Sequence, residues 1–342
     1  MTTADHVALV LGGGNALGAY QAGAYAALHR HGLPIHRIVG ASAGAINGAL
    51  IAGNAPEDRL ARLAGLWQPA PGPVPASWMP QSADTARRSL AATWALTTGR
   101  TGIFRPRGTA LWQAMVGADH PGMYDTSELE ATLRASIDVD RLNAGDIAYA
   151  ATAVDLESGE DVVFDTAEMV VTPTHVRASS ALPPAFPPIE IEGRWYVDAG
   201  LSANLPLDPI LAAPRPGTTL CIAIDLLPLA SPRPQSLGEV TERTQDLIFA
   251  AQSRRTLARW QAVAAAQGIG PDTPSVHVVH LQYAAQEREI SGKAFDFSPE
   301  TAHERWAAGE HAMTGLLDAL DRGSIAIGIP GLTVTTLRPD GR

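Results

Sequence analysis

Two motifs of small residues near the start of the chain have the residue types that acyl transfer requires. A glycine triplet, Gly12-Gly13-Gly14, follows a short apolar run, and Gly40-Ala41-Ser42-Ala43-Gly44 places a serine between two glycines. A serine on a tight turn between a strand and a helix is a typical acyl-transfer nucleophile. Backbone N–H groups in a nearby glycine loop can stabilise the oxyanion that develops. The two motifs together therefore supply the parts of half an ester-cleaving site.

The glycine triplet alone is compatible with three ligands: a dinucleotide pyrophosphate, a phosphate or a transient oxyanion. Successive glycines let backbone N–H groups approach any of these anions at the start of a helix. A dinucleotide site of a nicotinamide-dependent oxidoreductase would also have an acidic residue about 20 residues further on, at the end of the second strand. That strand ends in Gly40-Ala41-Ser42 without an acid, which argues against the nucleotide interpretation.

A serine nucleophile needs a base, and Asp198 is the stronger candidate. It ends the run Arg194-Trp-Tyr-Val-Asp198 and is followed by Ala199-Gly200. An acid at a strand end before small residues suits a functional carboxylate, although an aspartate that only caps a turn has the same pattern. Among the ten histidines, His277 and His280 are the best candidates for a Ser-Asp-His triad. Both are explained as well by an ordinary strand.

These motifs resemble the patatin-like phospholipases, which are lipid acyl hydrolases with a Ser–Asp dyad and no catalytic histidine. The resemblance covers roughly residues 7–228. It rests on four stretches in family order, which are residues 11–21 (LGGGNALGAYQ), 40–47 (GASAGAIN), 178–188 (ASSALPPAFPP) and 196–206 (YVDAGLSANLP). Residues 151–159 (ATAVDLESG) also resemble a strand and turn of the family. Residues 293–299 (KAFDFSP) and 305–309 (RWAAG) resemble a C-terminal extension of one bacterial branch of the family.

The resemblance implies a three-layer α/β/α fold with a mainly parallel central sheet and a helical cap. It also implies a carboxylic ester hydrolase that acts on a lipid or another acyl ester through an acyl-enzyme, without a cofactor or metal. The residues that it assigns are the nucleophile Ser42, the base Asp198, the oxyanion donors Gly12, Gly13, Gly14 and Ala43, the glycines Gly40 and Gly44 beside the nucleophile, and Ala199 and Gly200 of the aspartate motif.

Three positions depart from the usual family pattern. The family often has Arg or Lys where this chain has Leu17, and Gly where it has Asn15. Its aspartate is usually followed by Gly, and here by Ala199. The missing charge at Leu17 leaves the preference for a phosphate headgroup open. It also motivates an alternative, a non-catalytic lipid-binding protein that has kept the fold.

Hydrophobic periodicity predicts strands that alternate with helices from the start of the chain. Apolar runs at residues 6–11 and 35–39 are typical of buried strands, and residues 16–31 and 43–52 of helices. This order predicts parallel strands covered by helices, with both motifs at the carboxyl ends of strands, where such sheets bind ligands. Later strands are expected at residues 149–154, 161–164, 195–197 and 219–224, and helices at residues 126–137, 241–266 and 299–320.

We expect one domain over residues 1–342, with a core at about 6–230. A cap insertion is expected at about 57–120 and a helical C-terminal extension at about 236–342, of which the last twenty residues are irregular. Residues 59–113 contain seven arginines, one acid and four of the seven tryptophans. They suit either a helical satellite with its own aromatic core or a lid that faces substrate or membrane.

Composition excludes several partners. The net charge of −10 argues against nucleic acid and against broad adsorption to anionic lipid. Cys221 is the only cysteine, so no internal disulfide forms, and its apolar neighbours predict a buried strand residue. Neither a signal-peptide pattern nor a good membrane span is found. We expect a cytoplasmic protein, with contact at a membrane surface and the oligomeric state left open.

Overall fold

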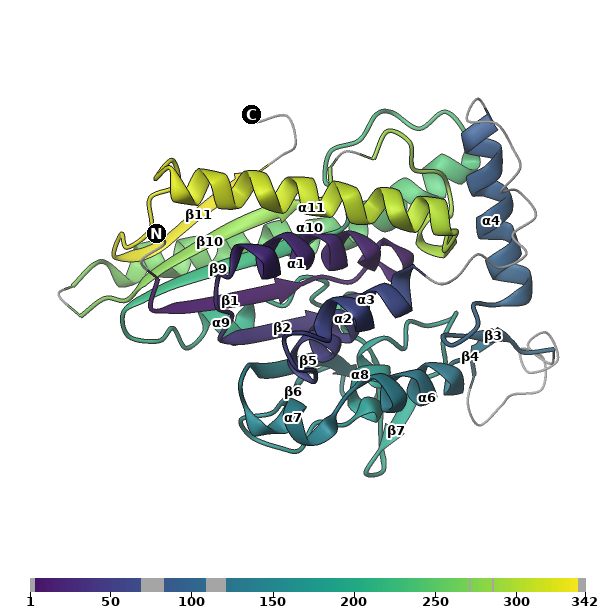
Figure 1. Ribbon diagram of the computed structural model, residues 1–342, viewed down its shortest axis with the longest axis horizontal. Coiled ribbons are helices and arrows are strands. Elements are labelled where there is room, and N and C mark those ends of the chain that lie inside the picture. The colour runs from purple at the N-terminus through teal and green to yellow at the C-terminus, as the bar shows by residue number, and fades with distance from the viewer. Residues whose placement is uncertain (1–3, 69–82, 109–120, 271, 285, 338–342) are drawn as a thin grey trace.

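The computed structural model describes residues 4–68, 83–108, 121–270, 272–284 and 286–337. Its centre is a nine-stranded sheet in the order β11-β10-β9-β1-β2-β5-β8-β7, with β6 paired to β5, and a separate two-stranded sheet joins β3 and β4 (Figure 1). The strands are β1 His6–Leu11, β2 Arg37–Ala41, β3 Arg105–Pro106, β4 Tyr124–Asp125, β5 Ala148–Asp155, β6 Asp161–Asp165, β7 Ile189–Ile191, β8 Arg194–Asp198, β9 Thr218–Asp225, β10 Ser275–Gln282 and β11 Gly331–Leu337.

The six strands from β11 to β5 are parallel, and the pairings of β6, β8 and β7 are antiparallel. The mainly parallel sheet predicted from the sequence is thus confirmed. Because β1 and β2 are parallel neighbours, with Leu11 opposite Gly40, the two small-residue motifs begin side by side at the carboxyl ends of these two central strands.

Helices cover both faces of the sheet, as the alternating side chains of β1 show. Leu9 and Leu11 pack in the cluster that contains α1, α2 and α11, whereas Ala8 and Val10 pack with α9 and α10 (Figure 1). The α/β/α layering is therefore confirmed. The helices are α1 Gly18–His31, α2 Ala43–Ala52, α3 Arg59–Trp67, α4 Asp84–Thr98, α6 Ser127–Ser136, α7 Val139–Ala144, α8 Pro173–Ser179, α9 Asp208–Leu211, α10 Leu237–Gln267 and α11 Pro299–Asp321, with 3-10 turns η1 Asn15–Leu17, η3 Ala199–Leu201 and η4 Lys293–Phe295.

The expectation of an irregular C-terminus was wrong for β11. This strand pairs in parallel with β10 along its whole length, at the edge of the sheet. Its sequence GLTVTTL is rich in β-branched residues, which suit a pleated surface. The Gly and Pro residues before it mark a loop and do not prevent pairing once β10 offers a free edge.

The predicted cap residues contact both the core and the C-terminal extension. Trp67 of α3 is buried in the main core, whereas Trp94 of α4 is 44% exposed. Trp78 and Trp112 lie outside the described residues. Phe104 contacts aromatic rings from three other segments, among them Phe186 and Phe295. The division into core, cap and extension remains a prediction.

Helix α11 packs directly against α1 through two glycines. A Cβ atom on Gly309 would overlap the carbonyl oxygen of Tyr20, and one on Gly23 would overlap that of Trp306. The two backbones therefore approach too closely for any side chain at these positions. Residues 18–28 of α1 are buried throughout, since the helix lies under α11.

We predict that Gly309→Ala lowers the free energy of unfolding by about 2 kcal/mol or more, because the new methyl group must push the helices apart. Gly315 lies on the same helix with nothing within 4 Å of a Cβ atom. Gly315→Ala should instead raise stability by up to about 1 kcal/mol, through helix propensity alone. Urea unfolding of both variants measures the difference, and equal effects would contradict the close packing.

Candidate active site

Ser42 lies in a strained turn between β2 and α2. Its φ of 55° and ψ of −123° are rare for a residue with a side chain. A Cβ atom on Gly44 would overlap the carbonyl oxygen of Leu11, and one on Gly40 would overlap that of Gly44. The glycines on both sides of Ser42 are thus required by backbone contact, as expected for a sharp turn.

The backbone of Ser42 is held from both directions. Its N–H donates to the carbonyl and to the hydroxyl oxygen of Ser179, each at 3.1 Å. Its carbonyl accepts the N–H groups of Ala45 and Ile46 in the first turn of α2. These bonds stabilise the unusual backbone angles and leave the side chain of Ser42 facing a cavity.

Asp198 is the last residue of β8 and is buried in the same cavity. The N–H of Gly200 donates to its Oδ1 atom at 2.7 Å, whereas its Oδ2 atom is buried without a hydrogen-bond partner. Burial raises the pKa of Asp198 to about 6, although the nearby Ser42 hydroxyl and the Gly200 N–H lower the pKa in part. The carboxylate is therefore more basic than an ordinary aspartate.

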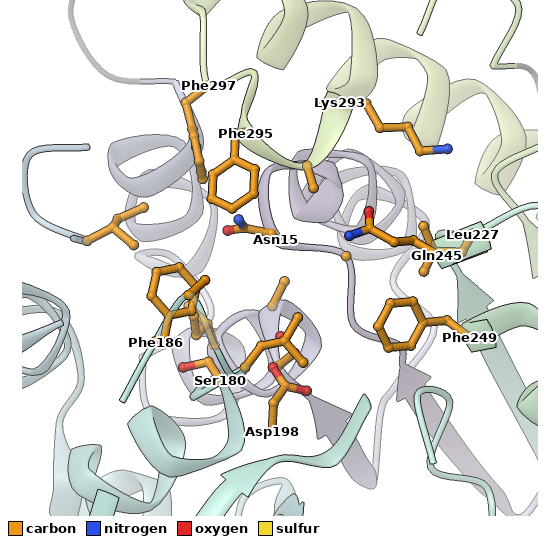
Figure 2. A pocket seen from close by; sticks show the side chains of 18 of the residues that line it. Asn15, Ser180, Phe186, Asp198, Leu227, Gln245, Phe249, Lys293, Phe295 and Phe297 are labelled. Atoms are coloured by element: carbon orange, nitrogen blue, oxygen red, sulfur yellow. The ribbon is translucent and has the colours of Figure 1, made fainter. Parts of the chain in front are cut away.

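The cavity is lined by both apolar and polar side chains. Figure 2 shows Asn15 near the centre, with Phe186, Phe295 and Phe297 on one side, and Gln245 and Lys293 on the other. The apolar lining residues include Ile46, Leu129, Leu182, Phe186, Phe249, Phe295 and Phe297, and the polar ones include Asn15, Asn204, Glu242, Gln245, Asp246 and Lys293. Ser42 and Asp198 thus face a cavity suited to an amphipathic molecule.

Lys293 holds together the polar side of the cavity. Its Nζ atom lies 3.0 Å from Glu242 Oε1 and 2.9 Å from Asp246 Oδ1, and it also donates to Gln286. Burial raises the pKa of both acids, and the lysine charge opposes that rise. The cluster joins α10 to the η4 segment, so it fixes two walls of the cavity relative to each other.

The structure narrows the set of predicted oxyanion donors. The N–H of Gly12 donates to Ile224 and that of Gly13 to Asn204, both at 3.0 Å, so neither is available to a substrate. Within the described ranges, the N–H groups of Gly14 and Ala43 have no acceptor, and both residues line the cavity. The sequence could not show this division, because the two acceptors come from about 200 residues further along the chain.

A buried amide network that sequence reasoning missed supports the glycine loop. Gln21 donates to the carbonyl of Gly12 at 2.7 Å, and Asn47 donates to Gln21 at 2.9 Å. The indole N–H of Trp67 donates to Asn47 at 2.6 Å. The signal was present in the sequence: Gln21 and Asn47 are uncharged polar residues in otherwise small or apolar helices, where buried amides need partners.

Two departures from the family pattern have a structural explanation. Leu17 is fully buried in the main core, so this position does not present a charge to the cavity. Asn15 has a φ of 50°, a conformation that favours glycine and that asparagine tolerates better than most residues. Ala199 is buried in the turn after Asp198.

The histidine candidates are engaged away from this cavity. His280 contacts Asp225 at 3.3 Å, and His277 contacts Thr333 and Thr335. The described residues that line the cavity include no histidine. Cys221 is buried in β9, as expected, and burial raises the pKa of its thiol to about 12. In the described ranges, no group of three or more His, Cys, Asp or Glu residues could hold a metal ion.

Comparison with known families decides the relationship. A family model described as patatin-like phospholipase matches residues 9–211. The chain belongs to this family. A second model, described as patatin phospholipase, matches residues 240–322, which confirms the family resemblance of the C-terminal extension. Membership of the patatin-like phospholipases supports lipid acyl hydrolysis as the general activity.

Solved structures that align with this chain include VipD and the type III effector ExoU. VipD from Legionella pneumophila aligns with a TM-score of 0.49 and 16% identity, over 93% of this chain and 68% of VipD. ExoU from Pseudomonas aeruginosa aligns with a TM-score of 0.39 and 17% identity, over 92% of this chain and 53% of ExoU. The chain thus spans about half the length of ExoU. A search of curated proteins found no match. None of the helices in the described part is long and apolar enough to cross a membrane.

We predict that Asn47→Ala lowers the free energy of unfolding by about 1–3 kcal/mol, because it leaves the buried indole N–H of Trp67 without an acceptor. Adding Trp67→Phe to this variant removes the unpaired donor. The substitution should therefore lower the free energy of unfolding less in Asn47→Ala than it does in the wild type. A double-mutant cycle by urea unfolding measures this coupling. Strictly additive effects would show that the two side chains do not act together.

We also predict that Asp198→Asn changes how stability depends on pH. A raised folded-state pKa means that the folded protein holds this proton more tightly than the unfolded chain does. Wild-type stability from this group is therefore full below about pH 4 and is lost as the pH rises through about 6. Relative to the wild type, the Asn variant should gain up to about 3 kcal/mol between pH 4 and pH 7. A pH-independent difference in urea unfolding would contradict the raised pKa.

Proposed function

We propose that this protein is a serine lipid acyl hydrolase in which Ser42 is the nucleophile and Asp198 the base. The observation that carries the proposal is the buried, unpartnered Oδ2 atom of Asp198 in the cavity that Ser42 also faces. A buried carboxylate oxygen without a donor is costly to maintain. Such a cost is expected where the oxygen must accept a proton during each reaction cycle.

In the first half of the reaction, Ser42 Oγ attacks the ester carbonyl carbon and its proton moves to Asp198. The carbonyl oxygen becomes an oxyanion, which the free N–H groups of Gly14 and Ala43 stabilise. Each such donor is commonly worth about 3 kcal/mol of barrier. The carbon–oxygen bond to the alcohol then breaks, and the leaving oxygen takes the proton from Asp198. The acyl group remains bonded to Ser42.

In the second half, Asp198 accepts a proton from a water molecule that attacks the acyl-enzyme. The oxyanion forms again at the same donors, the bond to Ser42 Oγ breaks, and Oγ takes the proton back. A free aspartate is a weak base for a hydroxyl. Burial makes Asp198 more basic, which supports its use here without a histidine.

The shape of the cavity indicates how a lipid would lie. The side with Phe186, Phe295 and Phe297 suits an acyl chain, because these rings offer apolar surface. The side with Gln245 and the Lys293 cluster suits the alcohol part of the ester. Substrates of this form include phospholipids, lysophospholipids and acylglycerols, so the activity is that of a phospholipase A, a lysophospholipase or an acylglycerol esterase.

We predict that a serine-reactive phosphonate probe labels the wild type and fails to label Ser42→Ala. Asp198→Asn should reduce ester hydrolysis on the order of 10²- to 10⁴-fold, the range for loss of a general base. Mass spectrometry of fatty acids released from a lipid panel measures the turnover. Equal labelling of Ser42→Ala would remove Ser42 as the nucleophile, and hydrolysis that survives in Asp198→Asn would remove Asp198 as the base.

A further prediction concerns pH. Because Asp198 must be ionised to accept a proton, kcat/KM should rise with pH through about 6 and then level off. The profile is measured with a soluble short-chain ester, so that lipid packing does not change with pH. A rate that stays constant from pH 5 to pH 8 would contradict a base whose pKa burial raises to about 6.

A further inference from the structure

Helix α4 buries two arginines and exposes two large apolar side chains, which is unusual for a surface helix. Arg87 and Arg88 face inward and are 7% and 2% exposed, whereas Leu90 and Trp94 face outward and are 49% and 44% exposed. A surface helix normally turns its charges to water and its apolar stripe to the core. The outward residues of α4 therefore suit an environment that is less polar than water.

Buried ion pairs fix this orientation. Arg88 pairs with Asp84 of its own helix, with Glu289, and with Glu304 of α11. Arg87 pairs with Asp84 and donates to Ser298. Turning α4 to hide Leu90 and Trp94 would break these pairs and leave buried charges unpartnered, which is strongly unfavourable. The outward apolar residues are thus held in place by the charges behind them.

Most hydroxyl groups on the outside of α4 already donate to carbonyls of the same helix. Ser89 donates to the carbonyl of Thr85, Thr93 to that of Ser89, and Thr97 to that of Thr93, at 2.8–2.9 Å. A hydroxyl bonded in this way loses less when water is removed from it. No exposed position from Thr85 to Thr98 carries a charge. We call this surface the outer face of α4; it consists of Thr85, Ser89, Leu90, Thr93, Trp94 and Thr97.

The start of α10 continues the same kind of surface. Leu237 is 83% exposed and Ile248 is 55% exposed, and Thr241 and Thr244 donate to carbonyls one turn earlier. Glu239 is the charged exception, and it caps the first turn of the helix. A short segment links the two helices, because Gly238 of α10 lies against Ser291 and Gly292 lies against Ala92 of α4.

Helix α10 lines the cavity that contains Ser42, and α4 packs against a segment that lines it. Phe249 of α10 lines the cavity, as do Gly292 and Phe295 of the segment on which α4 packs. In Figure 1, α4 stands at the end of the sheet where β1 and β2 end. We propose that the outer face of α4, with the adjoining first turns of α10, docks on the lipid–water interface of an uncharged membrane. This docking rests on the proposed function in one respect, which is that a lipid substrate must reach the cavity.

Charge and residue type favour a membrane as the occupant. Tryptophan and leucine with neutral hydroxyls suit the boundary between headgroups and acyl chains. The net charge of −10 disfavours an anionic bilayer, and the outer face offers no cation to attract one. Docking should therefore occur on zwitterionic lipid and depend on apolar burial.

The test uses vesicles of phosphatidylcholine and the full chain with Ser42→Ala, so that lipid is not consumed. Flotation measures binding. Leu90→Ser with Trp94→Ser should weaken binding roughly tenfold or more, since two partly inserted apolar side chains are lost. Ile269→Ser is the matched control: Ile269 is 71% exposed, just beyond the opposite end of the 31-residue helix α10, and should bind as the parent does. Binding should also persist in 0.5 M salt.

A second measurement locates the inserted residue. Phosphatidylcholine brominated on its acyl chains should quench part of the tryptophan fluorescence of the parent. Trp94→Phe keeps an apolar ring, so it should retain binding and lose that part of the quenching. If the parent floats and the quenching persists in this variant, a surface other than the outer face of α4 enters the membrane.

Other outcomes overturn the proposal. If the parent does not float with vesicles, or if salt abolishes its binding, the proposal is wrong. It is also wrong if light scattering shows that the parent is a dimer and that Leu90→Ser with Trp94→Ser makes it a monomer. The proposed activity is judged separately, with the active chain on a soluble short-chain ester. Docking without turnover removes the activity and keeps the surface. Turnover of the soluble ester without vesicle binding removes the surface and keeps the activity.

Discussion

The burial of one carboxylate is the constraint on which the rest of the site depends. Asp198 has one oxygen bonded to the N–H of Gly200 and the other without a partner. Taking a carboxylate out of water raises its pKa and costs stability whenever it is ionised. The surrounding structure must therefore be stable enough to hold an unfavourable group beside Ser42, and the closely packed sheet and helices around it provide that stability.

The parallel pairing of β1 and β2 brings the remaining parts to the same place. Each strand ends in small residues, and the backbones approach so closely that Gly44 must be a glycine. The glycine loop uses two of its N–H groups to bond to neighbouring backbone, and this leaves Gly14 and Ala43 to face the cavity. A rigid loop with few free donors is better organised for an oxyanion than a mobile loop with many.

Much of the fold and the positions of Ser42 and Asp198 could be predicted from sequence, because strand ends, tight turns and small residues are local signals. Three features could not. The partners of Gly12 and Gly13 come from distant segments, so their N–H groups looked free. Strand β11 forms because β10 presents an edge, which no local pattern reveals. Leu17 looked like a missing charge at the site and is in fact part of the core.

The contact between Gly23 of α1 and Trp306 of α11 affects the order in which the structure can form during synthesis. Helix α1 carries Gln21, which supports the glycine loop, and α11 is the last helix of the chain that the structure describes. As the chain leaves the ribosome, the turn at Ser42 appears long before the helix that covers α1. The packing that supports the glycine loop is therefore complete only after α11 has been synthesised, and a shorter nascent chain has Ser42 and Asp198 without the helix that packs on α1.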